Sequence, residues 1–469
     1  MTAPGTADRP LRVAIVGAGP AGFYAADYLL RQTDVVAEVD MFDRLPTPYG
    51  LVRAGVAPDH QKIKSVIAVF EKVAAHPRFR FYGCVELGRH LSVEDLRRHY
   101  HQIVYTTGAQ TDRRLGIPGE DLEGSHAATE FVAWYNGHPD YRERCFDLSQ
   151  ERVAVVGVGN VAVDVARILC RTPEELAATD VADHALEALR TSRVREVYLL
   201  GRRGPAQAAF TNPEIKELGE LPGADIVVRP EEVELDELSR AALERNPDRT
   251  TQKKIEILQS FARRPPAGKP RTLILRFLVS PMELIADGRG RVAAMRLARN
   301  RLTATDTGAL QPTPTGQIEE LPVGLVFRSV GYRGVALPGV PFNERGGVIL
   351  NDKGRVLDPA TKHPVAGEYT AGWIKRGPTG VIGTNKPDAV ETVSGMLEDA
   401  KAGRILNPAE PGSPAVARLL TGRQLRYVSY EDWLKLDELE TARGRPAGRP
   451  RVKFTRIEEM LAALGRPGE

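Results

Sequence analysis

The sequence has few of the features that mark metal-binding or disulfide-stabilised proteins. It contains three cysteines in 469 residues. Cys84, Cys145 and Cys170 lie too far apart to form a CxxC pair or to follow the spacing of a metal site. We therefore expect no disulfide, no zinc site and no iron–sulfur cluster, and we interpret the three cysteines as reduced thiols of a cytoplasmic protein.

Long apolar runs and a large charge of one sign are also missing. No stretch approaches the about 18 consecutive apolar residues of a membrane-spanning helix, and the first residues lead into the apolar run Leu11–Val16 without a leader-like segment. The formal net charge is +3, which indicates no general affinity for nucleic acid or membranes. Hydrophobic residues make up 42% and charged residues 27%, as in a globular protein of two or three domains.

Two segments share a pattern of strand, glycine turn and helix. They are Arg12–Leu30 and Arg152–Leu169. Each opens with a β-branched apolar run, turns on glycines and continues with the periodicity of an amphipathic helix. This pattern is typical of dinucleotide-binding units, so the sequence predicts an α/β protein with two Rossmann-like domains.

The first turn carries a complete GxGxxG motif, formed by Gly17, Gly19 and Gly22. The first glycine allows a tight turn, the second lets the backbone approach a pyrophosphate, and the third lets the helix pack closely on the strand. Asp43 ends the next apolar strand. An acid at this place accepts hydrogen bonds from ribose hydroxyls and repels a 2′-phosphate, which favours FAD.

The second turn is a GxGxxA variant that begins at Gly157 and includes Gly159 and Ala162. The strand after it ends at Arg202 and Arg203, where an NAD site would have an acid. Two guanidinium groups at this place form charge-assisted hydrogen bonds with a 2′-phosphate. The second unit is therefore predicted to bind NADP(H).

Two strand-and-loop segments, Ile103–Asp121 and Leu325–Gly334, are interpreted as crossings between the domains. The NADP unit would then be inserted into a discontinuous FAD domain. The predicted divisions are 1–112 for the first part of the FAD-binding domain, 113–328 for the NADP-binding domain, 329–407 for the second part of the FAD-binding domain, and 408–469 for a C-terminal extension.

Local signals predict further helices. Thr172–Arg190 is interpreted as one polar surface helix with a capping box made by Thr172 and Glu175. Thr384 or Asn385 is expected to cap a helix through Ala389–Met396. A flavin whose N1 edge met that helix N-terminus would gain a partial positive charge. Prolines after Arg404 mark a linker, and the sequence leaves open whether the tail behind it is mobile or packs on the body.

Several longer segments resemble adrenodoxin reductase and the bacterial ferredoxin–NADP⁺ reductases similar to it. The segments are Leu45–Lys64, Asn160–Leu169, Gly201–Thr211, Arg328–Gly334 and Gly372–Ala389. The resemblance extends from about Arg12 to Leu397. It implies an NADPH-dependent flavoprotein that passes electrons one at a time to a small acidic iron–sulfur ferredoxin.

The resemblance also implies site residues. FAD contacts are expected at Ala21, Asp43, Leu51, Val85, Trp373, Gly380, Val381 and Ile382. NADP contacts are expected at Val158, Gly159, Asn160, Val161, Arg202, Arg203, Glu214, Gly380 and Arg113. His60 and Glu217 are expected to form a catalytic polar pair that orients groups at the nicotinamide. One departure is Asp43, which stands where the family usually has Glu, so that its contact with the ribose is longer or water-bridged.

Other functions remain open at this stage. Disulfide reductases need a redox-active cysteine pair, which this sequence lacks. Glutamate synthase-like electron-input subunits carry N-terminal cluster cysteines that are also absent. A glutamate synthase-like electron-input subunit, a flavin monooxygenase and a non-catalytic NADPH-sensing flavoprotein stay as alternatives. Basic residues suited to docking an acidic ferredoxin occur at Arg263, Arg264, Lys269 and Arg271, and in the tail run Arg443–Lys453.

Overall fold

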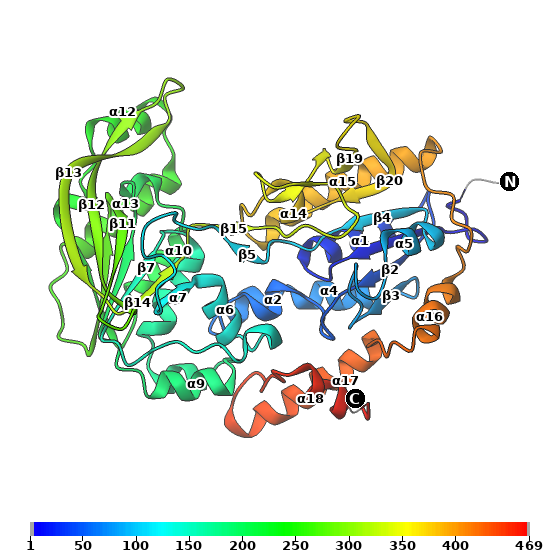
Figure 1. Ribbon diagram of the computed structural model, residues 1–469, viewed down its shortest axis with the longest axis horizontal. Helices are drawn as coiled ribbons and strands as arrows, with labels where there is room; N and C mark the ends of the chain where they lie inside the picture. Colours follow the sequence, from blue (N-terminus) through cyan, green and yellow to red (C-terminus); the bar gives the residue numbers. More distant parts are fainter. Residues whose placement is uncertain (1–3, 467–469) are drawn as a thin grey trace.

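The computed structural model describes residues 4–466 and contains two large sheets that lie side by side, the first mainly parallel with an antiparallel edge and the second parallel (Figure 1). Residues 1–3 of the expected FAD domain and 467–469 of the expected extension lie outside the described residues. The first sheet has the strand order β18-β19-β20-β4-β1-β2-β3 and the second has the order β6-β14-β7-β8-β10-β9. We call the bodies built on them the first and the second nucleotide domain.

The first nucleotide domain takes its strands from both ends of the chain. They are β1 (Leu11–Val16), β2 (Ala37–Phe42), β3 (Phe79–Tyr82), β4 (Gln102–Tyr105), β18 (Asn351–Asp352), β19 (Arg355–Leu357) and β20 (Pro364–Thr370). Its helices are α1 (Pro20–Leu30), α2 (Leu51–Ala54), α3 (Gln61–Lys64), α4 (Ile67–Ala74), α5 (Val93–His99), α14 (Trp373–Arg376) and α15 (Asn385–Lys401). The pairing of β20 with β4 is parallel and joins the late part of the chain to the early part.

The second nucleotide domain lies between these two parts in the sequence. Its strands are β6 (Ser125–Ala127), β7 (Arg152–Val156), β8 (Glu196–Leu200), β9 (Ala224–Val228), β10 (Arg271–Arg276) and β14 (Leu325–Arg328). Its helices are α6 (Ala128–Tyr135), α7 (Asn160–Cys170), α8 (Pro173–Ala177), α9 (Asp183–Arg190), α10 (Asn212–Leu218), α11 (Pro230–Val233), α12 (Glu237–Arg245) and α13 (Arg249–Ala262). An antiparallel sheet of β11 (Val279–Ala286), β12 (Val292–Ala304) and β13 (Leu310–Pro322) covers one face.

The chain crosses between the domains twice, and the crossings pair with each other. β5 (Thr111–Asp112) and β15 (Tyr332–Arg333) form a two-stranded antiparallel link between the two sheets (Figure 1). A second small hairpin, β16 (Phe342–Asn343) with β17 (Val348–Ile349), follows the return crossing. The tail contains α16 (Ser413–Gly422), α17 (Tyr430–Gly444) and α18 (Ile457–Ala463).

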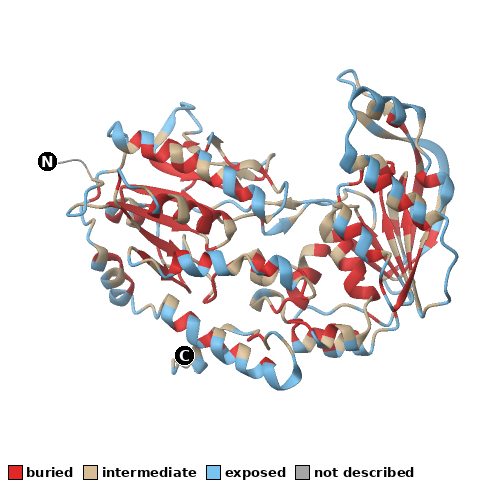
Figure 2. Ribbon diagram, turned by 180° about the vertical axis from the view of Figure 1, so that it is seen from behind, coloured by how far each residue is buried: buried red, intermediate tan, exposed pale blue. Residues whose placement is uncertain are grey.

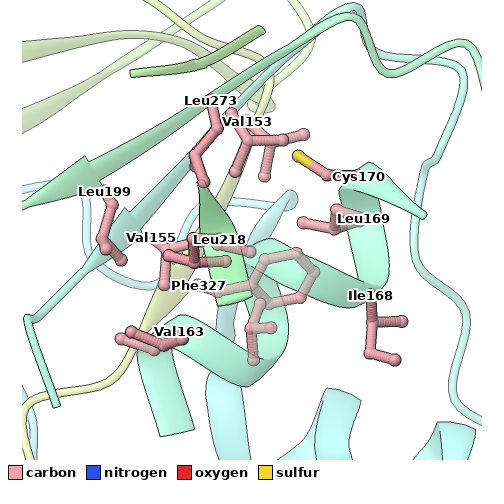
Figure 3. Close-up of a cluster of buried hydrophobic side chains, with 14 of the residues drawn as sticks. Val153, Val155, Val163, Ile168, Leu169, Cys170, Leu199, Leu218, Leu273 and Phe327 are labelled. Carbon is pink, nitrogen blue, oxygen red and sulfur yellow. The ribbon is translucent and has the colours of Figure 1, made fainter. Parts of the chain in front are cut away.

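The strand sequences explain why both sheets are buried on both faces. In β7, Val153 and Val155 belong to the core on the helix side, which Figure 3 shows, whereas Ala154 and Val156 belong to the core under the antiparallel sheet. Alternate side chains of a strand point to opposite faces, so a continuous apolar run supplies two cores at once. Figure 2 shows the resulting buried strands inside each domain and the exposed residues along its outer helices.

The expected single helix over Thr172–Arg190 is wrong, because the structure has two helices there. Thr172 and Glu175 form the predicted capping box at the start of α8. The chain then leaves the helix before α9, because Asp180 turns inward and accepts hydrogen bonds from the buried ammonium of Lys64 at 2.7 and 2.8 Å. Among residues 4–466, no helix is both long and apolar enough to span a bilayer.

Candidate functional site

The glycine turn after β1 is closed on one side and open on the other. Gly17 has φ +107°, and a Cβ there would lie 2.7 Å from the carbonyl oxygen of Thr106. A Cβ on Gly22 would lie 2.4 Å from the carbonyl oxygen of Gly17. At Gly19, by contrast, a Cβ would meet no described atom within 4 Å. The backbone at Gly19 therefore faces open space at the N-terminus of α1, which fits the approach of the FAD pyrophosphate.

Asp43 ties the end of β2 to this turn. Its carboxylate accepts hydrogen bonds from the backbone N–H of Ala18 at 2.8 Å and of Leu45 at 2.9 Å. Val85 donates its N–H to the carbonyl oxygen of Asp43 at 2.8 Å. Burial raises the pKa of Asp43, although the two backbone bonds oppose this shift. Asp43 is also one of the residues that line a small cavity beside Gly50.

The second turn repeats this construction. Gly157 has φ +135°, and a Cβ there would lie 2.2 Å from the carbonyl oxygen of Ser329, whereas a Cβ on Gly159 would meet no described atom within 4 Å. The side-chain oxygen of Asn160 accepts the N–H of Thr211 at 2.9 Å. This bond fixes the turn against the loop that follows β8, and the open side again faces away from the protein.

Arg202 and Arg203 follow β8 beside the second turn. Arg202 is exposed and Arg203 is partly buried, and within residues 4–466 neither guanidinium makes an ion pair. Burial and the neighbouring Arg202 lower the pKa of Arg203. Hydrogen bonds hold the backbone of both arginines. The side chain of Asn300 in β12 donates to the carbonyl oxygen of Arg202 at 2.9 Å, and the N–H of Leu278, just before β11, donates to the carbonyl oxygen of Arg203 at 3.2 Å. The backbone of the two arginines is thus held in place, and within residues 4–466 their guanidinium groups are not neutralised, which suits a phosphate.

A buried arginine joins the two domains near these turns. Arg167 in α7 is fully buried and donates to Asp59 of the first domain at 2.7 and 3.1 Å. It also donates to Asp164 at 2.6 Å and to Glu214 at 3.1 Å. Burial opposes ionisation of Asp59, but the bonds from Arg167 lower its pKa well below the usual range. The charge of Arg167 therefore supports three carboxylates at the domain boundary.

His60 lies at the edge of this cluster. Its Nε2 is 3.0 Å from Glu217, and its Nδ1 is 3.7 Å from Glu214 and 3.9 Å from Asp164. The pair expected from the sequence thus comes together across the domain boundary, 157 residues apart in the chain. Burial and the neighbouring Asp164 raise the pKa of Glu214.

The same cluster has the residue types of a metal site. The ligand atoms of His60, Asp164 and Glu214 lie within 4.8 Å of one another. The guanidinium of Arg167 donates to both of these carboxylates, so it already supplies their positive charge. We therefore assign no metal to this cluster, and its electrostatics are those of a buried ion network.

The late loop lies beside the crossing between the domains. The indole of Trp373 packs against Tyr332 with ring centroids 5.3 Å apart, and its Nε1 donates to the carbonyl oxygen of Thr379 at 3.2 Å. Gly380 has φ +79° and is exposed, as is Val381, whereas Ile382 is partly buried. Val381 therefore lies on an exposed part of the loop, between Gly380 and Ile382.

The expected side-chain cap of the following helix is wrong. α15 begins at Asn385 and extends to Lys401, and no side chain caps its N-terminus. The Thr384 hydroxyl donates instead to the carbonyl oxygen of Val381 at 2.6 Å, and Asn385 donates to that of Ile382 at 3.0 Å. These bonds shape the loop and leave the positive end of the helix beside Gly380–Ile382, where a flavin ring would gain from it.

The remaining expected contacts lie in different surroundings. Ala21 is buried in α1. Leu51 is the first residue of α2, Val158 and Val161 are partly buried against the core of the second domain, and Arg113 is exposed on the link between the domains. Arg113 N–H donates to Gly331 at 2.9 Å, so its backbone is fixed while its side chain reaches out.

Sequence reasoning missed Asp59, Asp164 and Arg167. A sequence signal for Asp164 and Arg167 is present in the segment Asn160–Leu169, where the two residues interrupt an otherwise apolar helix at a spacing of three residues. Charged groups on the buried face of a helix need partners. The partner Asp59 comes from the other domain, so the sequence alone does not identify it.

The chain is similar to proteins of known function over nearly its full length. The family described as Pyridine nucleotide-disulphide oxidoreductase matches residues 11–201. The chain is 46% identical to the NADPH-ferredoxin reductase FprA of Mycobacterium leprae over 456 residues, which cover 96% of this chain and 97% of the relative. It is 44% identical to the human mitochondrial NADPH:adrenodoxin oxidoreductase, with 98% and 93% covered. The solved structure of Mycobacterium tuberculosis FprA in complex with NADPH superposes with a TM-score of 0.91 at 46% identity and covers 97% of this chain and 100% of that one.

Proposed function

The chain belongs to the family of NADPH-ferredoxin reductases that includes NADPH:adrenodoxin oxidoreductase, and from this premise we propose that it is an FAD-dependent reductase that takes hydride from NADPH and passes the electrons singly to a ferredoxin. The observation that carries the proposal is the pair of open glycine turns at Gly19 and Gly159. The first is followed by an acid and the second by Arg202 and Arg203, which make no ion pair with the described residues 4–466. The first therefore suits a dinucleotide without a 2′-phosphate, and the second suits one that carries it.

The residues of the first domain fit FAD. The pyrophosphate would lie at Gly17, Gly19 and Ala21, the ribose at Asp43, and the ring between Leu51 and the late loop at Trp373 and Gly380–Ile382. Bound FAD supplies the ability to accept two electrons as hydride and to release them one at a time. The protein's part is to place the two rings together and to leave one edge open to an acceptor. This set of contacts is a proposal, as is the division at residues 112, 328 and 407; the change of sheet between β4 and β6 and between β14 and β18 supports its first two boundaries.

The second domain would hold NADPH by backbone and charge. Val158–Val161 form the pyrophosphate turn, and Arg202 and Arg203 take the 2′-phosphate. Glu214 and Gly380 would lie near the nicotinamide end, and Arg113 near the crossing. His60 and Glu217 orient the polar groups around the nicotinamide, because the reacting atoms belong to the cofactors.

A one-electron protein acceptor follows from the same chemistry, and we assign a small acidic iron–sulfur ferredoxin to this role. Arg263 and Arg264 are exposed at the end of α13 and remain candidates for docking it. Much of the tail run expected to help is already used inside the protein. Arg449, Arg451 and Lys453 make buried or partly buried bonds with other segments, so that part of the docking expectation is wrong.

The test is an anaerobic titration of the purified FAD-loaded protein with NADPH, followed by aerobic turnover with ferricyanide and with a ferredoxin. We expect loss of the oxidised-flavin absorbance with one NADPH per FAD and repeated turnover with both acceptors. Binding of NADPH without bleaching would favour the alternative of a non-catalytic NADPH sensor. Bleaching without transfer to any ferredoxin would refute the assigned acceptor but not the reductase.

A further inference from the structure

The C-terminal segment contacts both nucleotide domains. α16 packs on the first domain through Val416 and Leu420, and α17 does so through Trp433 and Leu436. Residues 445–456, which we call the crossing segment, then pass toward the second domain before α18 returns. In Figure 1 this orange-to-red part of the chain lies along the lower edge of the molecule, below the first domain and beside α9.

Lys453 is the central contact of the crossing segment. Its side chain is 1% exposed. Its ammonium donates to the carbonyl oxygens of Arg53 and Asn136, each at 3.2 Å, and pairs with Asp180 at 3.3 Å. Arg53 belongs to α2 of the first domain, whereas Asn136 ends α6 and Asp180 precedes α9 in the second domain. One side chain of the tail thus joins both domains.

Asp180 extends this contact toward the candidate site. It accepts from Lys64 at 2.7 and 2.8 Å as well as pairing with Lys453. Lys64 ends α3, which begins directly after His60. Arg53 in turn lies two residues after Leu51, an expected FAD contact. Lys453 therefore bonds directly to the helix that carries an expected flavin neighbour, and through Asp180 and Lys64 it is connected to the helix that follows His60.

Further bonds fix the crossing segment itself. Glu440 of α17 is 1% exposed and accepts from the guanidinium of Arg53 at 2.8 and 2.5 Å and from the N–H of Phe454 at 2.9 Å. Arg449 donates to the carbonyl oxygen of Thr179 at 3.1 Å and to Asp183 at 2.5 Å. The segment is thus anchored to the second domain at more than one place, and to the first domain directly through Lys453 and indirectly through Phe454 and Glu440.

Polar bonds dominate where the three parts meet. Val52 and Lys64 of the first domain, Asp180 of the second, and Trp433 and Lys453 of the tail line a shared cavity of about 200 Å³. A cavity contributes no packing contacts. Beside this cavity, the charged hydrogen bonds, which are strongly directional, help to set the relative position of the parts, together with the apolar packing of α17 on the first domain.

We infer that Lys453 is a positioning residue for hydride transfer, which holds the two nucleotide domains in the register that the reaction needs. This inference rests on the proposed function, because the nicotinamide would come from the second domain and the flavin from the first. Reacting atoms must lie within about 3–3.5 Å, and a displacement of about 1 Å can reduce a rate about a hundredfold. Loss of the ammonium removes bonds to both domains and leaves Asp180 with Lys64 alone.

The test compares Lys453→Met with the wild-type holoenzyme. Arg445→Met is the matched control, since Arg445 is an exposed cation of the same segment for which no side-chain bond is found among residues 4–466. We expect Lys453→Met to slow flavin reduction at saturating NADPH by about tenfold or more. Oxidation of the dithionite-reduced protein by ferricyanide should keep its rate, because that step needs no register between the domains. A merely structural loss would lower the folded, FAD-loaded fraction but leave the reduction rate of that fraction unchanged.

Hydrogen exchange supplies a readout that does not depend on activity. Amides at 133–138 and 50–56 should exchange faster in Lys453→Met than in Arg445→Met. Arg449→Met, which removes the second anchor on Thr179 and Asp183, tests the same idea if Lys453→Met does not fold, and it should slow reduction in the same direction. If NADPH reduces the wild-type enzyme and the variants are reduced at the same rate, the inference is overturned. Unchanged hydrogen exchange at both segments would overturn it as well. A wild-type protein that NADPH does not reduce would instead refute the proposed function.

Discussion

Replacement of both Arg202 and Arg203 by Gln should remove the preference for NADPH over NADH. The two guanidinium groups have no ion-pair partner in the described chain, so their charge is available to the 2′-phosphate. Their carbonyl oxygens are held by Asn300 and Leu278. The change should therefore remove charge without moving the backbone.

The size of the effect follows from charge-assisted hydrogen bonds. Each is worth about 1.5–3 kcal/mol, and two neighbouring ones do not add fully, so the double variant should lose about 2–4 kcal/mol. At about 1.36 kcal/mol for each factor of ten, kcat/KM for NADPH should fall about thirty-fold to several hundred-fold. The value for NADH, which lacks the 2′-phosphate, should change little.

The assay is the initial rate of ferricyanide reduction over a series of NADPH and NADH concentrations. Arg190→Gln, which removes an exposed cation at the end of α9, is the matched control and should keep the wild-type ratio. FAD content measured from the visible spectrum should be the same in all three proteins. A double variant with the wild-type ratio of kcat/KM values would show that other residues recognise the 2′-phosphate.

Three further predictions concern the pair at the nicotinamide, the docking of the acceptor and acid stability. His60→Gln should slow stopped-flow flavin reduction by less than the about hundredfold that loss of a general acid or base causes, and complete loss of reduction with FAD still bound would mean that His60 has a larger chemical role. Ferredoxin-dependent cytochrome c reduction should fall steeply above about 0.1 M salt, where the Debye length is about 10 Å. Ferricyanide reduction should change less, and equal salt dependence of the two activities would exclude docking by charges such as Arg263 and Arg264. Burial lowers the pKa of His101 from 6.5 to about 4. As the pH falls, the unfolded chain therefore takes up a proton on this ring before the folded protein does. The free energy of unfolding should then fall as the pH drops from 6.5 toward 4. In His101→Gln, that part of the pH dependence measured by urea unfolding should be absent, and an unchanged slope would contradict the assignment.

The sequence by itself determined the parts of this protein that depend on local pattern. Glycine at the first turn position is required by a backbone conformation that Gly17 and Gly157 adopt with positive φ. The apolar runs of β1 and β7 specify buried parallel strands. The acid after β2 and the two arginines after β8 distinguish the predicted FAD site from the predicted NADP site. These features lie within residues 11–43 in the first unit and 152–203 in the second, so no contact between distant segments is needed to recognise them.

Only the tertiary structure decided how separate segments share their charges. The sequence pattern of Thr172–Arg190 predicts one helix, but the chain breaks because Asp180 meets Lys64 and Lys453 from distant segments. The basic run at Arg443–Lys453 has the composition of a solvated tail, yet Lys453 is buried between two domains. A sequence pattern can indicate which charged groups need partners, but tertiary packing determines which partners they meet. The bond of Asp59 to Arg167, 108 residues apart, was therefore beyond sequence reasoning for the same reason.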